Sequence, residues 1–597
     1  MKVNNMTMLE YKYLFPEFQG DKHGEILSLI SGVDFEVAFP IIARLNFIVR
    51  EGQIKNYVDE VVFWFGDKSP LVNQYLFRIE HGYGGDELAK LRLLNIWSNL
   101  TLLQYFLEVY GQSENNVERI IDVAGTHERL FKAYLFINEI YVANFNSQKV
   151  VQSVPKGVGV IMMMGLTMTA MLLPYHDLNH IDDGDAMITQ FVKAVYFFQF
   201  AEANLPDVLA VFLGECGVGN WKEYFKAIFP VVDHAFKNNK DGLAYLTVDP
   251  NNPRAETSRL FLKRLAIDSH DSGFSQHDFI LPRSKPLLQI NSEKFVIVDN
   301  LLVYNKMYNS LFFEFNAIIK SNRALFTKGD FKGYLNDEFS ESCLAKQVLN
   351  SIFAEGKYIR FSGDEIRREY APDFIAEPDY YARNFDNIFL FELKDTFVSG
   401  LTKQSFNIER IIAELKSKLW YKETPKKDRI KEEPKAVRQL INNIKRAVFD
   451  ELPFDKDLEN KYLTFYPVLL FVDQGLSTPG INEIINHWFQ QELLNDPGLL
   501  RLQDRIAIKP LTMIDVDTLI IFQDDFKSGK FQLDEFISKY WAYKEGFLAL
   551  GKLGITQAVY DSTLTFGAFL RLFRKKRKTP AIFMEFGRLL FDKKRKS

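Results

Sequence analysis

Apolar residues recur every three or four positions from the start of the chain to about Leu265, for example in IIARLNFIVREGQIKNYVDEVVFWF. This spacing places the apolar side chains on one face of a helix, so residues 1–265 are predicted to form a large α-helical domain. The pattern changes between Asp268 and Arg283, where Ser, Gly, Asp, His and Pro gather. Because these residues interrupt regular structure, the sequence predicts a domain boundary there.

Beyond this boundary, short apolar runs alternate with helical patterns. PLLQI and FVIVD predict two short strands, residues 336–353 predict a helix, and KYIRF, PDFIAE and NIFLFELK predict three further strands. The helical segments FNIERIIAELKSKLWYKE and KAVRQLINNIKRAVFDE follow, then the strand YPVLLFVD and the helix INEIINHWFQQELL. We therefore expect an α-helical domain, a mixed sheet flanked by helices over residues 275–525, and a helical basic segment over 526–597.

The composition is that of an ordinary globular protein, with 47% hydrophobic and 25% charged residues. The net charge is −4 at pH 7, so any binding of nucleic acid must be local. Cys216 and Cys343 are too few for a disulfide framework or a cysteine zinc site. The N-terminal residues lack the apolar core of a signal peptide. These features together favour a reducing, cytoplasmic setting.

The uncharged segment from Gly157 to Tyr175 is long enough to span a bilayer as a helix. Its Gly and Thr residues and its late Pro weaken that interpretation, and no partner span is evident. A buried helix is the favoured prediction, and a membrane is not expected as a partner.

An acidic and a basic residue stand together at the end of the predicted strand NIFLFELK. Glu392 and Lys394 are two positions apart, so on a strand their side chains project to the same face. Burying both is unfavourable unless they pair with each other or face a metal ion and a phosphate. Asp373 opens the preceding predicted strand, and a hairpin would bring its carboxylate beside that of Glu392. Mg²⁺ is a natural counter-ion for two such carboxylates, and the lysine can then orient or deprotonate an attacking water.

In this order, Pro372-Asp373 followed by Glu392-Leu393-Lys394 resembles the PD-(D/E)XK nuclease superfamily. That family often has a Glu on the helix before the sheet, which Glu341 supplies, with Glu338 as a poorer candidate. It also often has a Gln on a helix after the sheet, and Gln439 in KAVRQL matches. The resemblance covers residues 336–473.

The resemblance implies a restriction-endonuclease-like fold and a Mg²⁺-dependent (or Mn²⁺-dependent) nuclease that cuts DNA rather than RNA. It implies that Asp373, Glu392 and the Leu393 carbonyl hold the metal, with Lys394, Glu341 and Gln439 assisting. Roles in restriction, anti-phage defence, repair or recombination all fit such a family. One ambiguity stays open, because Pro378-Asp379 is a second PD pair. Asp373 is preferred since PDFIAE has the pattern of a strand and PDYYARNFDN that of a turn.

Two basic regions are further candidates for binding. Lysines and an arginine near and beyond the predicted helix after the sheet can attract phosphate or belong to a solvated loop; they are Lys403, Lys416, Lys418, Lys426, Lys427, Arg429 and Lys431. The C-terminal segment from Arg571 can contact nucleic acid or an anionic membrane, or can dock as a helix through Phe583, Phe586 and Leu590.

The alternative from another class is a catalytically inactive, nuclease-like scaffold or interaction protein. In either case the helical N-terminal domain is expected to select a target, to bind a protein partner or to form an oligomer. Cleavage of nucleic acid separates the two classes.

Overall fold

The computed structural model describes most of the chain, and it divides into two compact units. The described residues are 7–51, 54, 56–112, 123–144, 159–179, 182–237, 245–267, 279–370, 377–426, 429–449, 452–456, 458, 462–502, 504–549, 561–574, 576 and 578–591. Unit 1 comprises residues 1–146, 178–190 and 207–322, and unit 2 comprises 147–177, 191–206 and 323–597. Each unit therefore draws on segments that are far apart in the sequence. The three consecutive domains expected from the sequence stay a prediction.

Unit 1 is mainly helical, as the spacing of its apolar residues predicts. Its helices are α1 (Tyr11–Leu14), α2 (Lys22–Ile30), α3 (Phe35–Glu51), α4 (Tyr57–Phe65), α5 (Pro70–Gly82), α6 (Gly85–Leu88), α7 (Ile96–Gln112), α8 (Val123–Asn144), α13 (Pro206–Glu215), α14 (Trp221–Lys237), α15 (Ala255–Leu265), α16 (Ile280–Ser284), α17 (Asn300–Asn305) and α18 (Leu311–Ser321). Two further helices, α11 (His176–Asn179) and α12 (Asp183–Asn204), contribute residues to both units, and the first residue of α13, Pro206, belongs to unit 2.

Short strands complete unit 1. They are β1 (Thr7–Met8), β2 (Leu91–Arg92), β3 (Tyr245–Thr247), β4 (Ala266–Ile267), β5 (Leu287–Gln289) and β6 (Lys294–Ile297). The predicted strands PLLQI and FVIVD correspond to β5 and β6, which pair antiparallel in a sheet of order β3-β6-β5-β4. The two-strand prediction is thus confirmed.

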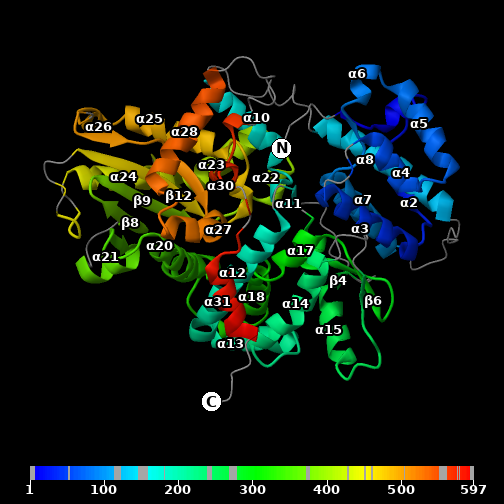
Figure 1. Ribbon diagram of the computed structural model, residues 1–597, viewed down its shortest axis with the longest axis horizontal. Coiled ribbons are helices and arrows are strands. Elements are labelled where there is room, and N and C mark those ends of the chain that lie inside the picture. Colours follow the sequence, from blue (N-terminus) through cyan, green and yellow to red (C-terminus); the bar gives the residue numbers. More distant parts are fainter. Residues whose placement is uncertain are drawn as a thin grey trace. The chain divides into compact units, whose positions relative to one another are not determined.

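Unit 2 is built around a mixed six-stranded sheet. Its strands are β7 (Ile359–Ser362), β8 (Tyr380–Asn384), β9 (Asn387–Lys394), β12 (Leu463–Phe471), β13 (Ile506–Ile508) and β14 (Thr512–Asp515). The order is β13-β12-β9-β8-β7, with β14 also paired to β12, and Figure 1 shows β8, β9 and β12 side by side. The β7, β8 and β9 strands are antiparallel neighbours, whereas β12 is parallel to β9.

Helices and a separate hairpin make up the rest of unit 2. They are α10 (Val160–Leu172), η2 (Arg323–Leu325), α19 (Phe331–Tyr334), the π-helix η3 (Leu335–Ala345), α20 (Lys346–Ile352), α21 (Gly363–Tyr370), α22 (Gly400–Lys403), α23 (Ile408–Leu419), the hairpin β10 (Tyr421–Lys426) and β11 (Arg429–Pro434), α24 (Ala436–Val448), η4 (Gln474–Ser477), α25 (Ile481–Leu494), α26 (Pro497–Leu500), α27 (Val516–Lys527), α28 (Leu533–Ala549), α30 (Phe566–Leu572) and α31 (Ala581–Phe591).

The two faces of the β9 strand pack against different layers. Ile388 and Leu390 belong to a hydrophobic core with residues of α10, α23, α24 and α25. On the opposite face, the rings of Phe389 and Phe391 contact Phe353, which directly follows α20. The apolar run of β9 predicts a strand that is buried on both faces, and the structure covers both faces.

One local prediction is wrong. The segment PDYYARNFDN was expected to be a turn, but Tyr380–Asn384 form β8, and only Phe385 and Asp386 turn back toward β9. Phe385 adopts the left-handed conformation, with a φ of 52°. The strand was hidden because β8 is paired on both sides and its residues 380–383 are all buried, so the alternation of apolar and polar residues is absent. Of the expected strand PDFIAE, residues 372–376 fall outside the described residues, and only Glu377 is described.

The uncharged segment 157–175 contains α10, a buried helix of unit 2. Met162, Leu166 and Ala170 are core residues, and Gly165 lies so close to Gly480 that a side chain at either position would meet the other's backbone oxygen. Among the described helices, none is long and apolar enough to cross a membrane. The prediction of a buried helix is therefore confirmed.

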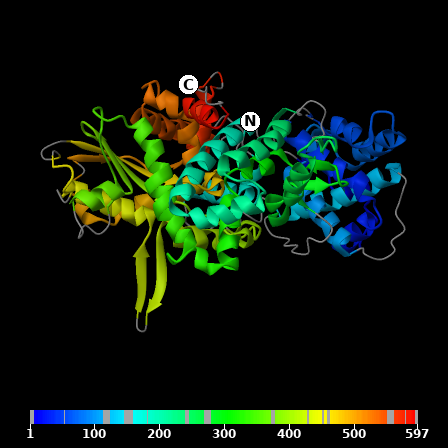
Figure 2. The same ribbon diagram turned by 90° about the horizontal axis from the view of Figure 1, so that it is seen from below.

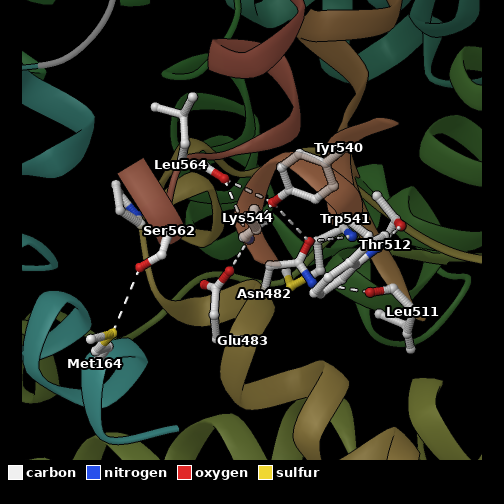
Figure 3. Close-up of polar contacts among 12 residues, drawn as sticks. Met164, Asn482, Glu483, Leu511, Thr512, Tyr540, Trp541, Lys544, Ser562 and Leu564 are labelled. Atoms are coloured by element: carbon white, nitrogen blue, oxygen red, sulfur yellow. Dashed lines mark hydrogen bonds and ion pairs between the residues drawn. The ribbon is translucent and has the colours of Figure 1, made fainter. Parts of the chain in front are cut away.

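A buried ion pair fastens α28 to α25 (Figure 3). The Nζ atom of Lys544 donates to Glu483 Oε1 and, at 2.7 Å, to the hydroxyl of Tyr540. Tyr540 in turn donates to the carbonyl oxygen of Leu564, just before α30, at 2.8 Å. This network ties the C-terminal helices to the sheet domain.

The C-terminal helix α31 packs onto α12. Phe583 meets Phe191 and Phe586 meets Tyr196 with ring centroids 5.1 Å apart in each pair, and Leu590 is buried. Of the three interpretations of this segment, docking through these residues is the one that the contacts bear out.

Candidate active site

The β9 strand delivers Glu392 and Lys394 to one place. Glu392 is buried, with 1% of its side chain exposed, whereas Lys394 keeps 22% of its side chain exposed. Lys394 Nζ donates to Glu392 Oε1 over 2.7 Å, as expected for residues that share a face of a strand. Among the described residues, the other oxygen, Glu392 Oε2, is buried and has no hydrogen-bond partner. A buried carboxylate oxygen left free is unfavourable, so this atom is suited to bind a cation.

Asp379 directly precedes β8 and lies across from the end of β9. Its Oδ2 atom accepts a hydrogen bond of 2.5 Å from the backbone N–H of Leu393. Tyr380 pairs with Phe391, so the next step of this register sets Asp379 opposite Glu392 and on the same face of the sheet. Asp379 of the second PD pair thus lies beside Glu392. Asp373 lies outside the described residues.

Glu341 reaches the same cluster from the π-helix η3. This helix follows α19 and continues into α20, and π-helical segments are frequent at functional sites. Glu341 is half-buried and lies 3.5 Å from the guanidinium of Arg367, while Glu338 on the same helix is exposed. Glu341 is therefore the acidic residue that the helix before the sheet contributes.

The acidic groups raise one another's pKa. Burial, followed by the charge of Asp379, raises the pKa of Glu392 to about 8 and that of Glu341 to about 9. Burial also raises the pKa of Asp379. For Lys394, burial opposes the charged form, but the charges of Glu392 and Asp379 outweigh it and raise its pKa to about 12. When ionised, these three carboxylates outnumber the one ammonium group, which favours binding of a further cation.

The donor set fits a hard divalent ion with few protein ligands. Within the described ranges, no group of three or more His, Cys, Asp and Glu side chains is placed to hold a metal ion by itself. Mg²⁺ keeps several waters and is usually held by only one or two carboxylates, which Asp379 and Glu392 can supply. The Leu393 carbonyl is the backbone ligand expected from the sequence, and its role stays a prediction.

Arg367 and Glu377 are members of the site that the sequence analysis missed. Arg367 lies on α21, and its guanidinium contacts Glu377 over 2.7 Å and Asp364 over 2.6 Å. Its half-exposed side chain thus adds a positive charge beside Glu341. The only sequence signal was the strongly amphipathic segment GDEIRREY, which indicates a helix but no role for a particular arginine.

Gln439 lies on α24, as predicted, but its side chain makes no hydrogen bond to the acidic cluster in the part of the chain that the structure describes. The buried face of α24 is formed by its apolar residues, among them Val437, Leu440 and Ile444, whereas Gln439 is half-buried. Its proposed role at the site stays a prediction.

Comparison with known proteins gives no match: no family model fits the sequence, and no curated protein and no solved structure is similar to it. The chemistry of the site must therefore be argued from its own residues.

Proposed function

We propose that this protein is a Mg²⁺- or Mn²⁺-dependent nuclease whose site is formed by Asp379, Glu392 and Lys394. The observation that carries the proposal is the buried Oε2 atom of Glu392, which has no hydrogen-bond partner among the described residues and lies beside a second carboxylate and an ammonium group. The order of elements adds support. The helical segment with Glu341 is followed by β7, α21, β8 and β9, then by α22, α23, the β10–β11 hairpin, α24 and β12, which is parallel to β9. The resemblance to the PD-(D/E)XK superfamily leads one to expect a helix, three strands, helices and a further strand in this order.

Each residue has a role that its position suggests. Asp379 and Glu392 would hold the metal ion, which when bound polarises a phosphate and lowers the pKa of a water. Lys394 is charged at neutral pH and partly exposed, so it can orient the attacking water and neutralise charge that builds on the phosphate. Glu341 would hold a proton near neutral pH and release it when a cation enters the cluster.

DNA is the proposed substrate in preference to RNA, and restriction or defence against phage is a proposed setting. Both rest on the resemblance alone.

Cleavage assays test the proposal. Purified full-length protein is incubated with double-stranded DNA, single-stranded DNA and RNA, each with Mg²⁺, Mn²⁺ or EDTA. We expect metal-dependent cleavage of at least one polymer and a loss of at least about a hundredfold in rate for Lys394→Ala. The matched control is Lys539→Ala, an exposed lysine of α28. Equal cleavage by wild type and Lys394→Ala would identify a contaminating nuclease.

A catalytically inactive scaffold is the second candidate. It is favoured by the ion pair between Lys394 and Glu392, which already engages one oxygen of the central carboxylate. Absence of cleavage with every polymer and metal would support it.

A further inference from the structure

The β10–β11 hairpin projects from the rest of unit 2 (Figure 2). Its sequence was expected to be either a solvated loop or a phosphate-binding band, and the structure shows a regular antiparallel pair of strands instead. At about 3.4 Å per residue, each six-residue strand reaches roughly 20 Å. An arm of this length can contact a large partner beside the body of the unit.

The register sorts the charges of the hairpin onto two faces. Residues paired directly across an antiparallel ladder share a face, and the next pair along lies on the other. One face carries the pairs Tyr421 with Pro434 and Glu423 with Glu432. We call this the inner face, because its residues contact helices of the same unit.

The inner face is neutralised by cations at the base of the arm. Lys416 of α23 contacts Glu423 over 3.2 Å, and Arg438 of α24 contacts Glu432 over 2.5 Å. The same two cations lie over the ring of Tyr421, at 4.3 and 4.0 Å from its centroid. The inner face therefore attaches the hairpin to α23 and α24 and leaves little charge free.

The outer face carries the pairs Lys422 with Glu433 and Thr424 with Lys431, and all four side chains are exposed. Its single acid, Glu433, is paired with Lys435 over 2.5 Å. Lys435, and then Lys422 and Lys431, lower the pKa of Glu433, which places all three cations near it. The outer face thus has an excess of positive charge. The register continues with Lys426 opposite Arg429.

Three other lysines of the expected basic band, Lys403, Lys416 and Lys418, are engaged within the protein, and Lys427 lies outside the described residues. Lys403 is buried and lies 3.4 Å from Asp177, and Lys418 donates to Glu414 and to the Phe397 carbonyl. Among the described lysines of this band, the accessible positive charge is therefore concentrated on the outer face of the hairpin.

We propose that the outer face of the β10–β11 hairpin, with Lys422, Thr424 and Lys431, binds double-stranded DNA along its major groove and contacts the phosphates. A two-stranded ribbon fits the major groove of B-form DNA, whereas that of an A-form RNA duplex is too deep and narrow. The exposed outer face carries no large apolar side chain, which disfavours a protein partner or insertion into a membrane. The choice of DNA as the class of partner rests on the proposed nuclease function.

Binding, measured apart from cleavage, tests the inference. Full-length protein in EDTA is titrated against a fluorescently labelled DNA duplex at salt concentrations from about 50 to about 200 mM. For Lys422→Gln/Lys431→Gln we expect binding weakened roughly tenfold and a salt dependence (the slope of log K against log salt) shallower by about 2. Glu433→Gln should strengthen binding by about threefold, because it removes the negative charge of the outer face.

Lys90→Gln/Lys237→Gln is the matched control, because it removes two exposed lysines of unit 1 and should leave binding unchanged. The inference is overturned if wild type does not bind the duplex, or if the hairpin variant binds with the wild-type affinity and salt dependence. It is also overturned if single-stranded DNA, duplex RNA or anionic vesicles bind more tightly through the hairpin.

The two proposals can fail separately. Cleavage of DNA that is unaffected by the hairpin variant, together with unchanged binding, overturns the inference alone. Hairpin-dependent binding of duplex DNA without any cleavage overturns the proposed nuclease activity alone.

Discussion

Asp379 accepts a hydrogen bond from the backbone N–H of Leu393, the residue between Glu392 and Lys394. This contact fixes the start of β8 against the end of β9, and with it the position of the second carboxylate relative to the first. Asp379 belongs to the second of two PD pairs, six positions after Asp373 in the sequence.

The choice between the two aspartates predicts different variant activities. Asp379→Asn should reduce metal-dependent cleavage by about a hundredfold or more, because it removes a proposed metal-binding carboxylate. Asp373→Asn should retain cleavage within a few-fold of wild type. Rates measured on one DNA substrate at saturating Mg²⁺ check this. Loss of cleavage in Asp373→Asn but not in Asp379→Asn would assign the metal-binding role to Asp373.

The raised pKa values of Glu392 and Glu341 predict that stability falls as pH rises. Both carboxyls hold their proton more tightly in the folded than in the unfolded protein, where the ordinary value is 4.5. The folded state therefore binds more protons between pH 4.5 and about 8 to 9, and the free energy of unfolding decreases with pH over that window. The slope is at most about 1.4 kcal/mol per pH unit for each carboxyl.

Thermal unfolding in EDTA across this pH range measures the effect. Glu392→Gln should flatten the dependence, whereas Glu355→Gln, at a side chain that is 90% exposed, should leave it unchanged. An equally steep dependence in wild type and Glu392→Gln would contradict the assignment.

Mg²⁺ should stabilise the protein more at higher pH. A metal ion binds the ionised carboxylates, so its binding competes with the protons that Glu392 and Glu341 hold near neutral pH. We expect the rise in Tm on adding Mg²⁺ to be larger at pH 9 than at pH 6, and to disappear in Glu392→Gln. Calorimetry with matched ionic strength checks it. A rise that is the same at both pH values would point to binding elsewhere.

Removing Lys544 should strongly destabilise unit 2. Lys544→Met leaves the buried carboxylate of Glu483 uncompensated, which costs about 3 to 5 kcal/mol, or a fall in Tm of roughly 10 °C. Glu483→Leu/Lys544→Met should recover much of that loss, because both charges are then absent. Lys539→Met, at an exposed pair on the same helix, should change Tm by no more than about 2 °C. A double variant as unstable as Lys544→Met would show that the network matters for packing rather than for charge.

The local sequence determined the elements whose pattern depends only on neighbouring residues. The apolar run of NIFLFELK predicts a buried strand, and the spacing of two residues places Glu392 and Lys394 on one face, as the structure confirms. Similarly, the helical spacing predicts α23, α24 and α25 close to their actual bounds, and with Glu341 it predicts a helical segment before the sheet.

Only the tertiary structure decided which distant residues meet. The register between β8 and β9 places Asp379 beside Glu392. The β8 strand was mistaken for a turn because its burial comes from strands and core residues elsewhere in the chain. Arg367 of α21 contacts Glu341 of η3, and α10 contacts α25 where Gly165 lies against Gly480. Such contacts depend on long-range packing, which the spacing of residues along a chain does not encode.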